Sequence, residues 1–357
     1  ISSAASDVYK RQTISCRKHS IPELRTLLQM QSRETSADLW HQKPYYSLDA
    51  WCKNTYGRKL YKAALDIGCT CPNRDGTLDT RGCIFCSAGG SGDFAASRQL
   101  SVTDQLNQAK ALLSSKWTPE PGKPSLIAYF QAYTNTYGDP DRLLSCYEEA
   151  LSSPEVAGIS IATRPDCLSD IILEGLDRLQ LLYPDRFIWI ELGLQSIHDH
   201  TAARIRRGYP TSVFYDAAAK LHARRLPFIV HLILGLPGET RLDLQESIRA
   251  VNQVHPFGVK LQLLHILKGT DLALLYEAGK LPVLTQEEYL DLLTSCIAAL
   301  SPDICLHRVT GDGPRKLLIA PQWSLSKRNV LNGLHALMKQ RNLRQGDNYE
   351  SGTSYTL

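Results

Sequence analysis

The sequence has no apolar run of the ~18–20 residues that a membrane-spanning helix requires. Its first residues also lack the apolar core of a secretory signal peptide. Paired cysteine spacings are missing at Cys146, Cys167, Cys296 and Cys305, which stand in apolar or helical contexts. That pattern disfavours a disulfide framework and favours reduced thiols. We therefore expect a cytoplasmic protein that does not associate with membranes.

Neither positive nor negative charge predominates in the sequence. The net charge is +4 over 357 residues, which permits a polyanionic partner without requiring one. The hydrophobic content of 43% suffices for one large α/β domain with a smaller extension. No close internal repeat is visible, which argues against a solenoid.

Methionine is rare, and the chain begins with Ile1. The segment Asp7–Gln12 resembles a translated transposon-sequencing adaptor, so we interpret residues 1–12 as an assembly scar and Met30 as a candidate start. We expect residues 1–38 to be non-native and disordered.

Three cysteines fall in one loop with the spacing C-x11-C-x2-C: Cys71, Cys83 and Cys86. The short apolar stretch 63–68 precedes the loop and predicts a buried strand, and a glycine-rich run at 89–94 follows it. Proline, Asp-Gly and glycine between the cysteines disfavour regular structure there. Loops at the carboxyl ends of parallel strands are where α/β proteins place their chemistry.

Three thiolates in one loop suit an iron–sulfur cluster or zinc. A closed zinc site typically uses four ligands in two C-x2-C pairs, and no second such pair or C-x2-H partner is present. A [4Fe–4S] cluster on three cysteines keeps one iron open. Cys69 could complete a tetrad, because residues i and i+2 of an extended segment point the same way. Structural zinc, or cysteines that are merely buried, is the alternative.

Apolar stretches of strand length then alternate with helix-like stretches. The predicted strands, after the one at 63–68, are 125–132, 158–163, 187–194, 227–234 and 258–267. The predicted helices are 102–115, 140–152, 168–182, 211–225 and 241–254. Continuous apolar strands joined by helical crossovers predict a parallel α/β fold. Six units favour a partial (β/α)6, TIM-like barrel, with a flat doubly wound sheet as the alternative.

The alternation stops after Thr270. A helix at 284–300, a strand and turn at 308–314 and a second helix at 324–342 predict a small C-terminal α/β extension. We expect the aromatic residues of 39–62 to pack on the barrel rather than to bind a base. The predicted organisation is thus a barrel over 39–270, an extension over 271–345 and a polar tail over 346–357.

Polar residues cluster where the predicted strands end. They occur in the runs 129–136, 162–166, 191–196 and 235–239, and as His231, Gln262 and His265 on the fifth and sixth strands. Each has an ordinary interpretation as a turn, a cap or a satisfied core residue. Their convergence on one rim of a barrel favours a binding site.

The cysteine loop, with Asn-Arg-Asp-Gly at 73–76 inside it, resembles that of the radical S-adenosylmethionine (SAM) enzymes. The similarity is greatest to the YhcC-like bacterial branch, which is related to Elp3, MiaB, NifB and oxygen-independent coproporphyrinogen oxidase. Further matching motifs are Tyr-Phe-Gln-Ala-Tyr-Thr-Asn-Thr at 129–136, Glu-Leu-Gly-Leu-Gln-Ser at 191–196, Arg-Arg-Gly-Tyr at 206–209, Leu-Gly-Leu-Pro-Gly-Glu at 234–239 and the run 260–270. The resemblance covers about residues 40–330. Cys69 departs from it, since the branch usually has an aromatic residue there.

The resemblance implies that Cys71, Cys83 and Cys86 hold a [4Fe–4S] cluster whose open iron is chelated by SAM. It also implies six cofactor-binding residues: Phe85 near the adenine, Gln131 and Thr134 near the methionine amino group, Gln195 and His231 near the ribose, and Arg207 on the cofactor. An Arg fork suits a carboxylate, and a Gln amide suits a hydroxyl. The ordinary interpretation of Arg207 is a charge at a helix end.

The implied activity is reductive cleavage of SAM to a 5′-deoxyadenosyl radical that abstracts hydrogen from a substrate. It requires an external one-electron donor of the flavodoxin or ferredoxin type. We expect tRNA as a candidate partner, since Elp3 and MiaB act on it and basic residues gather between Arg308 and Arg344. The alternatives are a radical enzyme acting on a small molecule and a non-catalytic iron–sulfur or zinc protein that binds a partner.

Overall fold

The computed structural model describes residues 38–113, 122–311 and 313–350. The chain divides into two units, 1–42 and 43–357, and the second holds the sheets and every helix from Leu48 onward. The expectation of a disordered, non-native segment before residue 39 falls almost entirely outside the described residues. None of the described helices is long and apolar enough to cross a membrane.

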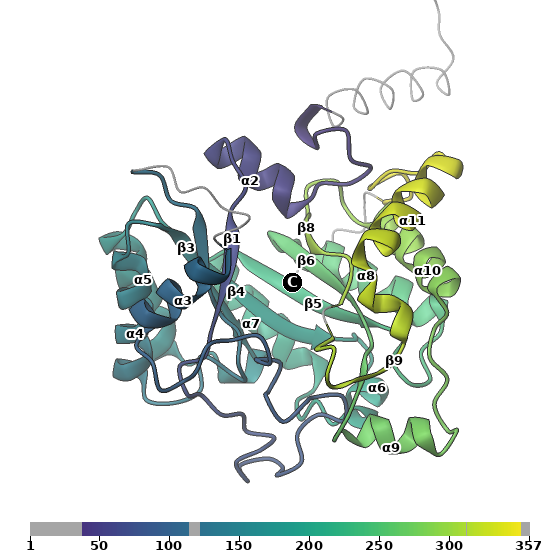
Figure 1. The fold of residues 1–357 in the computed structure, drawn as a ribbon, viewed down its shortest axis with the longest axis horizontal. Coiled ribbons are helices and arrows are strands. Elements are labelled where there is room, and N and C mark those ends of the chain that lie inside the picture. Colours follow the sequence, from purple (N-terminus) through teal and green to yellow (C-terminus); the bar gives the residue numbers. More distant parts are fainter. Residues whose placement is uncertain (1–37, 114–121, 312, 351–357) are drawn as a thin grey trace, which may run out of the picture. The chain divides into compact units, whose positions relative to one another are not determined.

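A curled parallel sheet forms the centre of the second unit (Figure 1). Its seven strands, in spatial order, are β1 (Tyr61–Leu65), β2 (Leu126–Phe130), β3 (Val156–Thr163), β4 (Phe187–Gln195), β5 (Phe228–Leu234), β6 (Gly258–Leu263) and β8 (Cys305–Arg308). The strand order follows the chain order and never reverses, as it would in a doubly wound sheet. The predicted partial barrel is confirmed.

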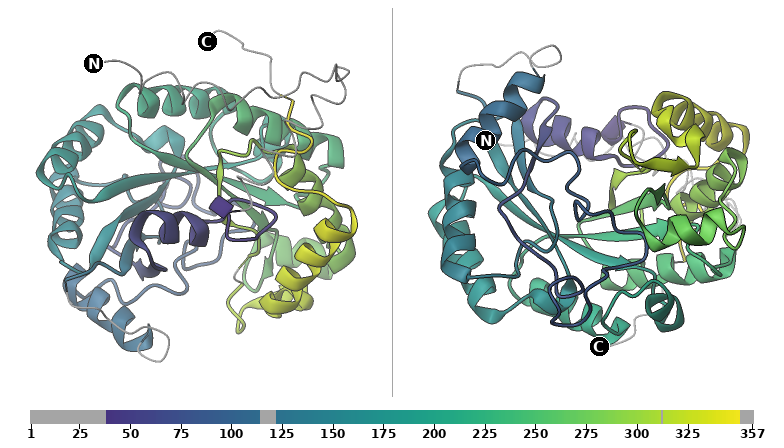
Figure 2. Two further views of the ribbon diagram at one scale, coloured as in Figure 1. Left: turned by 90° about the horizontal axis from the view of Figure 1, so that it is seen from above. Right: turned by 60° about the horizontal axis from the view of Figure 1, so that its bottom comes forward.

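Helices lie along the outer side of the sheet, as the view from above shows (Figure 2). They are α3 (Val102–Leu113), α4 (Pro140–Ser152), α5 (Asp170–Leu182), α7 (Thr211–Ala223) and α8 (Arg241–Val254). Two shorter helices lie elsewhere: α2 (Leu48–Tyr56) precedes β1, and α6 (Asp199–Arg204) follows β4. Polar caps fix where they begin: the Asp139 side chain accepts from the Arg142 amide, and Thr240 and Asp243 form a capping box. Apolar side chains of strands and helices form one continuous core between the two layers.

The C-terminal extension is made of β7 (Ile266–Leu267), α9 (Asp271–Glu277), α10 (Gln286–Ala299), β8, β9 (Leu318–Ala320) and α11 (Lys327–Gln340). Two sequence predictions need correction here. The strand predicted at 258–267 ends at Leu263, because β7 then pairs antiparallel with β9 in a separate small sheet. The strand predicted from Arg308 is instead β8, which adds a seventh strand beside β6.

An aromatic plug closes the amino-terminal end of the barrel interior. Trp189 of β4 is almost fully buried and packs against Trp51, Phe187 and Phe257, with ring centroids 3.9–5.0 Å apart. Gly158 of β3 allows this packing, because a Cβ there would lie 2.4 Å from the Phe187 ring and carbonyl. The expectation that the aromatic Trp51 packs on the barrel is confirmed. The open part of the barrel interior therefore lies toward the carboxyl ends of the strands.

Candidate functional site

The segment 66–101 leaves β1 at its carboxyl end and crosses the inner side of the sheet without forming a helix or strand (Figure 2). Side chains within the loop fix its course. Asn73 donates to the carbonyls of Arg206 (2.7 Å) and Arg207 (3.1 Å), and Arg74 donates to the carbonyls of Cys86 (2.8 Å) and Ser87 (2.7 Å). The loop is therefore tied both to itself and to the connection after β4.

Gly90 brings the end of this loop against the end of β2. Its φ is +58°, its carbonyl accepts from the Tyr133 amide at 2.8 Å, and a Cβ there would lie 2.4 Å from the Tyr133 ring. Both the backbone conformation and the close approach require glycine at this position.

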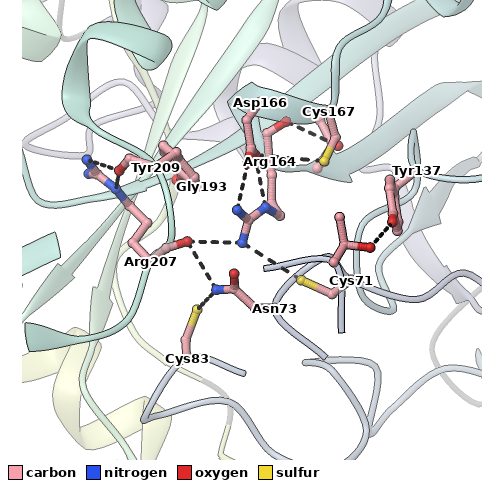
Figure 3. A network of polar contacts seen from close by, with 12 residues as sticks. Cys71, Asn73, Cys83, Tyr137, Arg164, Asp166, Cys167, Gly193, Arg207 and Tyr209 are labelled. Carbon is pink, nitrogen blue, oxygen red and sulfur yellow. Dashed lines mark hydrogen bonds and ion pairs between the residues drawn. The ribbon is translucent and has the colours of Figure 1, made fainter. Parts of the chain in front are cut away.

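The three loop cysteines, Cys71, Cys83 and Cys86, line one cavity of about 180 Å³. Figure 3 shows side chains directed at two of the sulfurs: Arg164 Nη1 lies 3.9 Å from Cys71 Sγ, and Asn73 Nδ2 lies 3.6 Å from Cys83 Sγ. Hydrogen-bond donors beside sulfur ligands stabilise the thiolate form and tune bound metal clusters.

Burial raises the pKa of the Cys83 thiol to about 12, with further raising by Cys86 and Cys71. Burial also raises the pKa of Cys86, against the opposing charge of Arg74. Thiols in such surroundings become thiolates by exchanging their protons for a metal ion. Burial thus favours a neutral thiol or a metal-bound thiolate over a free thiolate at Cys83 and Cys86.

Cys69 has a different environment. It is 3% exposed, belongs to the main hydrophobic core, and is not among the residues that line the cysteine cavity. Burial raises its pKa to about 11. A core position separates it from the three loop cysteines.

The six residues that the resemblance assigns to the cofactor all lie around this cavity: Phe85, Gln131, Thr134, Gln195, Arg207 and His231. They come from the loop, the ends of β2 and β4, the connection after α6 and the middle of β5. Closure of the barrel thus brings together the polar strand-end residues that the sequence pattern indicated as a binding site. Their individual roles stay predictions.

Gln195 occupies an irregular position. The pairing of β4 with β5 shifts register between Gly193 and Gln195, and Gln195 has a φ of +61°. Its amide satisfies its hydrogen bonds when the nitrogen faces the carbonyls of Gly193 (2.9 Å) and Leu194 (3.0 Å). A bulge with a left-handed non-glycine residue redirects a side chain at the end of a strand, and such positions concentrate at functional sites.

Arg207 is 1% exposed, and the protein itself engages its guanidinium. It donates to the carbonyls of Leu194 (2.8 Å), Ser196 (2.7 Å) and Tyr209 (3.1 Å) and to the Thr211 hydroxyl (2.9 Å). These bonds anchor the connection from β4 to α7. In this structure Arg207 is a structural anchor at the cavity wall, and its predicted direct contact with the cofactor stays a prediction.

A second cavity of about 330 Å³ adjoins the first and shares Phe85, Gln131, Gln195 and His231 with it. Gln262 and His265 of the sixth predicted strand line it, as do Gly311, Gly313 and Pro314 of the C-terminal extension. The extension therefore supplies one wall of the site.

The floor shared by the two cavities is a polar layer built on Glu191, which is fully buried. Its carboxylate accepts from Ser160 (2.6 Å), Lys62 (2.9 Å) and His231 Nε2 (2.8 Å), and it forms a close ion pair with Lys260. Burial alone would raise the pKa of Glu191, but Lys260, Lys62 and the His231 hydrogen bond hold it well below its usual range. Glu191 is therefore an ionised carboxylate.

Burial, with a smaller contribution from Lys260, lowers the pKa of His231 to about 4. His231 is thus neutral, and its Nε2–H donates to Glu191, which leaves Nδ1 as the acceptor nitrogen of the ring. This tautomer suits the hydroxyl-binding role that the resemblance assigns to His231.

Sequence reasoning assigned no role to Arg164, Lys62, Tyr129 or Lys260. Arg164 sits in a polar strand-end run, which was the available signal. Lys62 and Lys260 each stand alone in an apolar strand, 129 and 69 residues from Glu191, so their meeting depends on barrel closure.

Known proteins share both the sequence pattern and the fold around this site. The family model described as "Radical SAM superfamily" matches residues 80–251, and that described as "Radical_SAM C-terminal domain" matches residues 256–340. Protein YtqA of Bacillus subtilis is 40% identical over 305 residues, which are 85% of this chain and 92% of YtqA. Protein YhcC of Escherichia coli is 36% identical over 271 residues, 75% of this chain and 84% of YhcC.

Among solved structures, the Elp3 protein of the archaeon Methanocaldococcus infernus superposes with a TM-score of 0.57 at 17% identity. The superposition covers 69% of this chain and 61% of that one. It supports the fold alone.

Proposed function

Because the chain belongs to the radical SAM superfamily, we propose that it is an enzyme that uses a [4Fe–4S] cluster and SAM for radical hydrogen abstraction. The observation that carries the proposal is the convergence of the three loop cysteines and the six assigned cofactor residues on one cavity. When bound, the two cofactors supply one-electron cleavage of SAM to methionine and a 5′-deoxyadenosyl radical. The electron would come from an external donor of the flavodoxin or ferredoxin type.

The sulfur arrangement suits a cluster better than a single ion. Among the described residues, one group of three ligand atoms lies within 4.8 Å of one another, and it does not include Cys71, Cys83 or Cys86. One tetrahedral zinc, with Zn–S bonds of about 2.3 Å, would require sulfurs about 4 Å apart. A cluster spreads its cysteine ligands over several iron atoms, so the cysteine sulfurs can lie farther apart than around a single ion.

The chain's own residues then have separable tasks. Arg164 and Asn73 place donors beside the sulfurs of Cys71 and Cys83. Phe85 covers the junction of the two cavities, and Gln195 projects into it from the bulge of β4. A reactive radical needs its target held close and water excluded, and these are tasks for the side chains that line both cavities.

Cysteine variants test the proposal. Alanine at Cys71, Cys83 or Cys86 is expected to abolish a brown, oxygen-sensitive centre after anaerobic reconstitution, whereas Cys69→Ala is expected to retain it. Iron, sulfide and visible absorbance are the measurements. A colourless Cys69→Ala protein would indicate ligation by four cysteines and would contradict the radical reaction.

Release of 5′-deoxyadenosine on reduction in the presence of SAM separates an enzyme from a non-catalytic metal protein. The wild-type protein is expected to release it, and the Cys83→Ala variant is expected not to. A coloured wild-type protein that releases no 5′-deoxyadenosine would favour the non-catalytic metal protein.

For the substrate we propose tRNA, on the basis of exposed basic residues at the two ends of α11. Val330, Leu334 and Met338 of this helix are buried, as the sequence predicted. Two basic residues at its start and two at its end are exposed: Lys327, Arg328, Lys339 and Arg341. Arg341 lies 2.5 Å from Asp291, so its charge is partly offset. Basic residues near a helix end also complement its dipole, which is the ordinary interpretation.

Filter binding of bulk tRNA at two salt concentrations tests this part. Binding through phosphates weakens steeply with salt, because condensed counterions are released. Changing the four basic residues of α11 to Glu is expected to abolish binding and to leave SAM cleavage intact. Four exposed basic residues elsewhere form the matched control: Lys53, Lys59, Arg178 and Lys220. Negligible binding at low salt, or equal loss in the control, would leave a small-molecule substrate.

A further inference from the structure

Two lysine ammonium groups share one carboxylate in the polar layer. Lys62 of β1 and Lys260 of β6 both contact Glu191 of β4, and both ammonium nitrogens lie 4.5 Å from the centroid of the Tyr129 ring. Lys260 and Glu191 are almost fully buried, so solvent cannot screen them. Burial lowers the pKa of Lys260 well below its usual range, and Glu191 opposes that shift. Two lysines thus compete for one carboxylate, and a buried charge is costly unless something compensates it.

Among the described residues, Tyr129 and His231 beside the lysines supply no second negative charge. Burial raises the pKa of Tyr129 well above its usual range, so its ring stays a neutral phenol. His231 donates to Glu191 and adds no negative charge. Asp93 lines the larger cavity, but its carboxylate faces the cysteine loop, where it accepts from the Ser87 hydroxyl at 2.8 Å.

Arg308 adds positive charge on the same side. It ends β8, pairs in register with Lys260 and lines both cavities. Its charge acts on His265 in the cavity wall: burial, with a smaller contribution from Arg308, lowers the pKa of His265 to about 4. Basic side chains therefore line the larger cavity from β1, through Lys62, and from the extension, through Arg308.

Lys62 is the charged member of the layer that lines this cavity, together with the neutral Tyr129 and His231. Its side chain is 20% exposed, it lines the 330 Å³ space, and a single Glu191 oxygen accepts one of its three N–H donors. We propose that Lys62, together with Arg308, binds an anionic group of the substrate, a carboxylate or a phosphate, in this cavity. The inference rests on the proposed function for its assignment to a substrate, and it specifies the chemistry of the part that enters the barrel.

Calorimetric titration of the purified full chain with sodium acetate, sodium phosphate and neutral acetamide tests the subsite. At least one anion is expected to bind, and acetamide, which matches acetate in shape, is not. The preferred anion distinguishes a carboxylate from a phosphate. Lys62→Met is expected to weaken anion binding by roughly tenfold or more, the usual consequence of losing a charge-assisted hydrogen bond.

Two further variants keep the test decisive. Lys62→Arg retains the charge and should retain binding, while Lys59→Met removes an exposed lysine beside β1 and should leave binding unchanged. Lys62→Met should fold, because Glu191 then keeps one partner in Lys260. Absence of anion binding at millimolar concentrations, or binding that Lys62→Met leaves unchanged, would overturn the proposal.

This measurement needs neither cluster nor SAM. A protein that binds anions through Lys62 but releases no 5′-deoxyadenosine would refute the proposed reaction and keep the subsite. A protein that releases 5′-deoxyadenosine but binds no anion through Lys62 would refute the subsite and keep the reaction.

Discussion

Replacing Glu191 by glutamine removes the one negative charge of the polar layer while keeping the side chain's size. The carboxylate is fully buried, accepts from four side chains and holds Lys260, which is 3% exposed at its side chain. The variant leaves that ammonium without a counter-charge and turns one acceptor oxygen into a donor. Breaking a buried ion pair by removing one partner typically costs about 3–5 kcal/mol.

We therefore expect Glu191→Gln to lower the free energy of unfolding by about 3–5 kcal/mol at neutral pH, measured by urea unfolding of the full chain. The loss should shrink as pH rises. Burial lowers the pKa of Lys260 well below its usual range, and Glu191 opposes that shift. Without the carboxylate the folded-state pKa should be lower still, so the stability of the variant should rise with pH over a wider window than that of the wild type.

Two controls separate charge from packing. Adding Lys260→Met to Glu191→Gln removes the orphaned ammonium and should recover much of the lost stability. Glu148→Gln, the same change at an exposed position on α4, should alter stability by no more than about 0.5 kcal/mol. A loss below about 1 kcal/mol for Glu191→Gln, or no recovery in the double variant, would refute the view that Glu191 compensates buried lysine charge.

Two further predictions concern the cofactor site and pH. Gln195→Ala and Arg207→Ala should each weaken SAM binding about ten- to hundredfold in anaerobic calorimetry. Arg207→Ala should also lower the unfolding temperature, because the Arg207 guanidinium donates to several backbone carbonyls. Unchanged SAM affinity in both variants would show that the roles assigned by resemblance are wrong. His231 and His265 have pKa values of about 4 in the folded protein, below the unfolded value. The unfolded state therefore binds more protons between about pH 4 and 6.5. The free energy of unfolding should fall as pH falls through that window, by up to about 3 kcal/mol for each histidine. Urea unfolding across that range checks this, and equal stability at both ends would contradict it.

The barrel could be predicted from the sequence because its strands are buried on both faces and read as continuous apolar runs. The seventh strand could not, because β8 is only four residues long and follows a long crossover through β7, α9 and α10 that breaks the regular alternation of strands and helices. Its pairing with β6 is a long-range event that leaves little local signal.

The cysteine loop was visible for the opposite reason: its spacing is local, and three thiols within sixteen residues restrict the chemistry regardless of the fold. The polar layer has no such local pattern. Lys62, Glu191 and Lys260 each interrupt an apolar strand once, and a single charge in a buried strand indicates a partner without saying which. Only the curl of the sheet, which brings β1, β4 and β6 around one interior, makes them neighbours. Local pattern therefore located the cysteine cavity, whereas the charges that we propose to bind the substrate are brought together by the closure of the barrel.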